Sequence, residues 1–167
     1  PLGVVRVTVI LRRNEALELN LVEYRGAIAL AELQAVAKFQ ADKPALLASD
    51  CLNRVCADAD FSAISFAMLD GMYDYYRRLF APLRLQIFRR AAWFCEAEGS
   101  RHHVAHWLSQ DARENMSSTV KHCETFADAA DWLLLMDTER GMLERGDGFE
   151  EVARFHLPPA RATALSH

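Results

Sequence analysis

The sequence predicts a single α/β domain, and two patterns carry that prediction. In residues 89–135, two short apolar segments alternate with two segments of helical periodicity. Strands that alternate with helices of this length pair in parallel within a sheet that helices cover. In residues 4–24, an alternating segment rich in β-branched residues and a second alternating segment flank a short turn, which is typical of an antiparallel hairpin. The domain should therefore combine a hairpin with parallel strands.

The elements are expected in the order ββαβαβαβα. The strands should span residues 4–11, 16–24, 45–52, 90–95 and 119–126, and the helices residues 28–41, 66–81, 102–113 and 127–135. Apolar residues recur at helical spacing in the first helix, and Lys43-Pro44 ends it. Ser65 is expected to cap the second helix, which Pro82 stops or kinks.

We expect two regions, an α/β domain over residues 1–136 and a C-terminal tail over residues 137–167. The tail holds three of the seven glycines, at Gly141, Gly146 and Gly148, and it contains the pair Pro158-Pro159. This composition favours a loosely structured terminus with one short helix at most. The alternative is a tail that docks onto a neighbouring protomer.

Composition and charge exclude several classes of function. Apolar residues make up 51% of the chain and charged residues 25%, as in an ordinary soluble globular protein. The net charge is −4 and the basic residues are scattered, so a nucleic-acid partner is not expected. No apolar run approaches the roughly 20 residues that span a bilayer, so we expect no membrane association. Four scattered cysteines predict no disulfide framework, and with no signal peptide in view they indicate a cytoplasmic protein.

Two histidines on the third predicted helix have the spacing of a metal site. His102 and His106 are four residues apart, which places both on one face, where imidazoles can bind zinc or nickel. The apolar stripe of that helix contains Val104, Trp107 and Leu108, so both histidines should point away from the core into solvent. No acidic residue lies between them as in a metalloprotease motif. We therefore expect neither a metal nor another cofactor.

A hydrolytic set is the weakest of the functional candidates. Asp60, Ser62 and His102 supply the acid, the hydroxyl and the imidazole that such a set needs, and all three follow the carboxyl ends of predicted strands. The serine, however, lacks the flanking glycines of a nucleophile elbow. No glycine-rich loop is present to hold a phosphate group either. We therefore expect no catalytic residue and no enzyme activity.

The second predicted helix carries a wider apolar arc than one sheet face requires. One quadrant, which includes Phe66, Leu69 and Tyr73, suffices to pack on a sheet. The adjacent quadrant contains Met68, Met72, Tyr75 and Leu79. Methionine and tyrosine are frequent in adaptable interfaces, so this quadrant is a candidate surface for a protein partner or a homodimer. The alternative is that neighbouring helices or the C-terminal tail cover it.

Four stretches of the chain resemble one known family. They are Tyr24-Arg-Gly26 before the first helix, the strand that ends in Asp50, residues 57–65 leading into the second helix, and residues 125–133 at the last helix. In this order they resemble the bacterial SpoIIAA-like proteins, relatives of the STAS domains of anti-sigma-factor antagonists, over about Val7 to Leu135. The resemblance implies a mixed sheet of four to five strands with helices mainly on one face. It also implies a non-enzymatic role in protein–protein regulation.

The same resemblance points to a regulatory loop before the second helix. Antagonist STAS domains carry a phosphorylatable serine there, usually in an Asp-Ser-Ser-Gly run, and the nearest match here is Asp60-Phe-Ser-Ala63. The candidate switch residues are Asp58, Asp60, Ser62 and Ser65. A phosphoserine at a helix N-terminus would be stabilised by free backbone N–H groups and by the helix dipole. The alternative is that Ser65 serves only as an N-cap and Ser62 is an ordinary loop residue.

These observations favour a small non-enzymatic module that binds another protein through its second helix and the preceding loop. A carrier of a small apolar ligand is the alternative from a different class. The nine phenylalanines, four tyrosines and three tryptophans could line a lipid-like pocket between helix 66–81 and the sheet, opening where Pro82 interrupts the helix. The partners to consider are thus another protein, a second copy of the chain, and a small apolar ligand.

Overall fold

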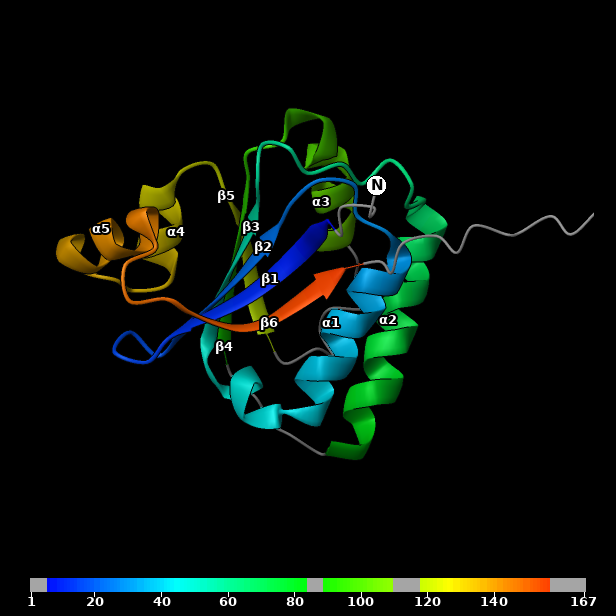
Figure 1. Ribbon diagram of the computed structural model, residues 1–167, viewed down its shortest axis with the longest axis horizontal. Coiled ribbons are helices and arrows are strands. Elements are labelled where there is room, and N and C mark those ends of the chain that lie inside the picture. The colour runs from blue at the N-terminus through cyan, green and yellow to red at the C-terminus, as the bar shows by residue number, and fades with distance from the viewer. Residues whose placement is uncertain (1–5, 84–88, 110–117, 157–167) are drawn as a thin grey trace, which may run out of the picture.

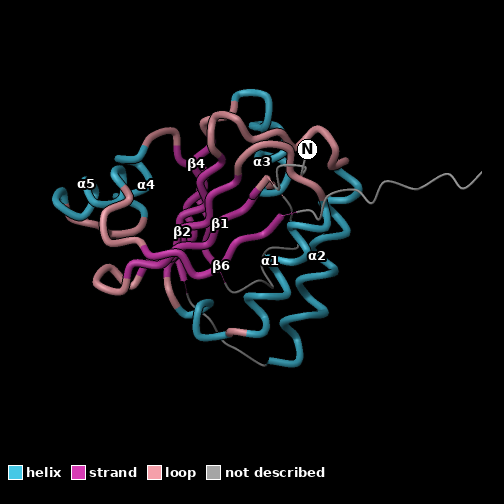
Figure 2. Tube along the Cα trace, viewed as in Figure 1, coloured by secondary structure: helices cyan, strands magenta, loops and turns pink. Residues whose placement is uncertain are grey.

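Six strands form one mixed sheet in the computed structural model, which describes residues 6–83, 89–109 and 118–156 (Figure 1, Figure 2). They are β1 (Val7–Asn14), β2 (Leu19–Tyr24), β3 (Asp50–Val55), β4 (Arg89–Cys95), β5 (Ser118–Cys123) and β6 (Glu150–His156), in the spatial order β5-β4-β3-β2-β1-β6. Strands β2 to β5 pair in parallel, whereas β1 is antiparallel to both of its neighbours. The mixed α/β architecture is confirmed. The expected count of four to five strands is wrong, because β6 adds a strand beside β1.

Five α-helices and three short 3-10 turns connect the strands in the described residues. The helices are α1 (Leu30–Asp42), α2 (Phe66–Phe80), α3 (Arg101–Leu108), α4 (Phe126–Trp132) and α5 (Asp137–Arg145), and the turns span Pro44–Ala48, Ala81–Leu83 and Glu98–Ser100. Helix α2 lies where the sequence predicts it, while residues 110–113 of the expected third helix fall outside the described residues. Within the described ranges, no helix combines the length and the apolar character needed to cross a membrane.

The third strand lies further along the chain than the sequence predicts. Residues 44–48 form a 3-10 turn rather than the start of a strand, because Pro44 is well suited to the first position of a helical turn. Strand β3 then begins at Asp50 and contains the buried Asn53, whose side-chain oxygen lies 3.4 Å from the Tyr24 hydroxyl that donates to it. The second half of β3 contains the polar Asn53 and Arg54, so the pattern of apolar residues did not predict it as a strand.

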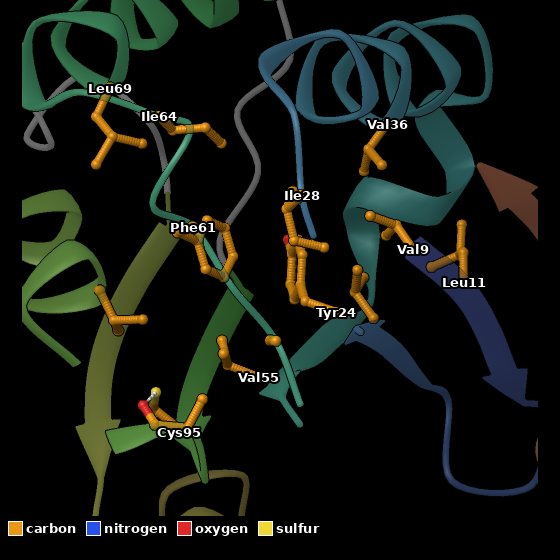
Figure 3. Close-up of a cluster of buried hydrophobic side chains, with 14 of the residues drawn as sticks. Val9, Leu11, Tyr24, Ile28, Val36, Val55, Phe61, Ile64, Leu69 and Cys95 are labelled. Carbon is orange, nitrogen blue, oxygen red and sulfur yellow. Dashed lines mark hydrogen bonds between the residues drawn. The ribbon is translucent and has the colours of Figure 1, made fainter. Parts of the chain in front are cut away.

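Apolar side chains are buried on both faces of the sheet. On the first face, β1, β2 and β3 pack with Val36 of α1, Leu69 of α2 and Val104 of α3, and Figure 3 shows part of this first core. On the second face, β2 to β5 contribute to a second core that includes Leu133 after α4 and Leu143 of α5. The helices therefore cover both faces, with α4 and α5 opposite α1 and α2 (Figure 1). This differs from the one-sided arrangement that the resemblance implies.

Residues 137–156 are packed on the sheet rather than forming the loose tail that their composition suggests. Leu143 of α5 is 1% exposed in the second core, and β6 pairs antiparallel with β1 of the same chain. Gly146 and Gly148 have φ angles of 73° and 74°, so they make the turn between α5 and β6. A Cβ atom at Gly148 would lie 2.9 Å from Nδ2 of Asn14, which fixes a glycine at this position. Residues 157–167 of the expected tail lie outside the described residues.

Shortening Leu143 tests whether α5 belongs to the core. Leu143→Ala removes atoms from a fully buried site, so the free energy of unfolding in urea should fall by about 2–5 kcal/mol. The control is Met136→Ala, just before α5, where the side chain is 67% exposed. It should change the same quantity by less than about 0.5 kcal/mol. Equal stabilities for Leu143→Ala and the unmodified protein would show that α5 is not packed as described.

Candidate interaction site at the start of helix α2

The loop from β3 to α2 is fastened to the chain that leaves β2. Ala27 and Asp60 form an isolated parallel bridge, in which the Asp60 N–H donates to the Gly26 carbonyl (2.7 Å) and the Ile28 N–H donates to the Asp60 carbonyl (2.9 Å). Gly26 has a φ of 59°, a left-handed conformation that glycine adopts without steric cost. The side chain of Phe61 then inserts into the first core (Figure 3). The loop therefore holds the start of α2 at a fixed place beside the sheet.

All four residues of the predicted switch loop lie at the surface. Asp58, Asp60, Ser62 and Ser65 are exposed. The Asp60 carboxylate accepts a hydrogen bond from the Ser62 N–H (2.8 Å), and the hydrogen bonds from Ser62 hold the pKa of Asp60 below its ordinary value. Ser65 Oγ accepts from the Met68 N–H (3.1 Å), so Ser65 is the N-cap that the sequence predicts. Both serines are exposed to solvent.

Helix α3 presents its histidines to the first turns of α2. The Phe66 ring stacks on the His106 ring, with 4.1 Å between centroids and 5° between planes. His106 Nε2 also lies 2.8 Å from a carboxylate oxygen of Asp70, one turn along α2. His103 is buried, and its Nε2 lies 2.8 Å from the Ile64 carbonyl oxygen. The prediction that His106 points freely into solvent is therefore wrong, because Phe66 and Asp70 engage it.

The acid, hydroxyl and imidazole of a hydrolytic set are not brought together at this loop. In the described part of the chain, Ser62 makes no hydrogen bond to a histidine. His103 is buried with its Nε2 at the Ile64 carbonyl, and His102 is exposed. Among residues 6–83, 89–109 and 118–156, no group of three or more His, Cys, Asp or Glu side chains is placed to hold a metal ion. The hydrogen bond at Asp60 stabilises the loop, and the one at His103 holds α3 against the start of α2.

The cysteines are core side chains in a reduced state. All four are free and buried. Burial raises the pKa of Cys51 and of Cys56 to about 11, and it also raises the pKa of Cys95 and of Cys123. Thiols with raised pKa values are protonated at neutral pH and are poor nucleophiles. They contribute to packing as small apolar groups.

The predicted interaction surface on α2 is only partly exposed. Phe66 is 42% and Met68 is 43% exposed, so the first turn of α2 presents two large apolar side chains close together. Met72, in contrast, is 3% exposed, and Tyr75 and Leu79 are half-buried on a helix that α1 packs against (Figure 1). Met72 therefore belongs to the interior and not to a surface for partners. Neighbouring helices cover part of the quadrant, as the alternative interpretation expected.

Sequence reasoning missed a charged network on the second face of the sheet. Glu23 is 4% exposed, and its carboxylate pairs with Arg12 (2.9 Å) and with Arg25 (2.7 Å). Beside it, Arg54 donates two hydrogen bonds to Glu96, of 2.9 and 3.2 Å. Glu23 and Arg54 are register partners in the parallel pair β2–β3, so they lie on the same face. The strict alternation of the two strands is the signal that could have placed them together.

Comparisons with protein-family models, with curated proteins and with solved structures found no match for this chain. The site is therefore interpreted from its own geometry. Three features define it: the backbone bridge at Asp60, the cap at Ser65, and the exposed pair Phe66 and Met68, of which Phe66 contacts the histidines of α3.

The cap of α2 can be tested with single serine substitutions. Ser65→Ala leaves the Met68 N–H without its acceptor, so the free energy of unfolding should fall by about 0.5–2 kcal/mol in a urea titration. Ser65→Asp can accept the same hydrogen bond and should retain most of that stability. Ser62→Ala, at an exposed residue that caps no helix, is the matched control. If Ser65→Ala proves as stable as the control, the cap does not contribute as the geometry indicates.

The buried carboxylate of Glu23 can be tested in the same way. Glu23→Gln removes the negative charge that pairs with two arginines, and the unfolding free energy should fall by about 1–3 kcal/mol. The loss is moderate for a buried ion pair because both arginines are a third or more exposed and can be solvated. Glu15→Gln, at an exposed carboxylate that pairs with Arg13, should leave the unfolding free energy almost unchanged. Identical effects of the two substitutions would contradict the described burial of Glu23.

Proposed function

We propose that this protein is a non-enzymatic regulatory module that binds another protein through the start of α2 and the loop before it. The observation that carries the proposal is the exposure of Phe66 and Met68 within one helical turn. Large apolar side chains that stay exposed close together mark interaction sites. The stacked His106 ring holds Phe66 in one orientation, so a partner would meet a preorganised surface and lose less entropy on binding.

The surroundings of this apolar pair fit the anatomy of an interface. Interfaces commonly have an apolar centre and a polar rim that solvent reaches. The exposed Asp58, Asp60 and Ser62 lie on the adjoining loop and would supply such a rim. Free, buried cysteines suit a reducing compartment, and we place the protein in the cytoplasm as part of the same proposal.

Phosphorylation is the regulation that we propose for this surface. A phosphate on Ser62 would bring about two negative charges next to the Asp60 carboxylate and weaken the turn that Asp60 closes. A phosphate on Ser65 would instead lie at the N-terminus of α2, where backbone N–H groups and the helix dipole favour an anion. Either modification changes the charge beside Phe66 and Met68, and with it the affinity for a partner.

Affinity purification of the protein from its native cells tests the proposal. Met68→Glu should abolish the recovery of partner proteins that the unmodified chain retains, because it places a charge in the apolar centre. Met136→Glu changes another exposed methionine, between α4 and α5, and should retain them. Thermal unfolding of both variants checks that the fold is intact.

Two results would contradict the proposed function. Recovery of the same proteins with Met68→Glu as with Met136→Glu would remove the start of α2 from the interaction. A native mass spectrum that shows the chain with a bound small apolar molecule and no protein partner would favour a ligand carrier instead.

A further inference from the structure

We draw no further inference here: the strongest candidate, the cluster of Arg12, Arg25 and Arg54 around the buried carboxylate of Glu23 on the second face of the sheet, has its charges balanced by Glu23, Glu96 and Asp58, so nothing in the described part of the chain shows that it takes an anion or any other ligand.

Discussion

Strand β2 is buried on both of its faces, and the rest of the molecule is arranged around that constraint. All six of its residues are buried, although Asn20 and Glu23 are polar. Apolar residues on the first face require the cover of α1, α2 and α3, and those on the second face require α4 and α5. The buried side chains of Asn20 and Glu23 need hydrogen-bond or ion-pair partners, because unpaired polar groups are costly in the interior. Asn20 accepts from Arg13 (3.1 Å) and donates to the Leu46 carbonyl (2.6 Å), while two arginines pair with Glu23.

The end of the same strand positions the interaction site. The Cys56 N–H donates to the Tyr24 carbonyl (3.0 Å), and the bridge between Ala27 and Asp60 follows within a few residues. These are backbone contacts, so the loop is held without using its exposed side chains. Phe61 and Ile64 anchor it in the first core, and the chain enters α2 directly afterwards (Figure 3). A rigid support with free surface side chains is what a binding site for another protein requires.

The sequence predicts best the elements whose stability is local. The hairpin β1–β2 follows from alternation, and α2 follows from its cap at Ser65 and its apolar periodicity. The sequence does not predict β6. The charged residues of this edge strand are typical of a loop, and the preceding Gly148 is typical of a flexible terminus. In fact Gly148 adopts a φ of 74° and lies against the side chain of Asn14, more than a hundred residues earlier in the chain, and both features favour glycine there. Contacts of that kind leave no mark on local composition.

The candidate site shows the same division. The exposure of Ser62 and the capping role of Ser65 could be read from the loop and the helix start alone. The burial of Met72 and the stacking of Phe66 on His106 could not, because both depend on how α1 and α3 pack against α2. A helical wheel of α2 gives the width of its apolar arc, but not which neighbours cover it.

Native-state hydrogen exchange of the full chain tests most directly whether β2 is the centre of the fold. Backbone amides in Leu19–Tyr24 and Asp50–Val55 should exchange only through global unfolding. The hydrogen-bonded amides of Ile28 and Asp60 should exchange more slowly than the amides of the exposed loop around Ser62. Protection at Glu150–His156 should accompany them, because β6 completes the sheet beside β1. Exchange in Leu19–Tyr24 as fast as in the loop around Ser62 would contradict this account.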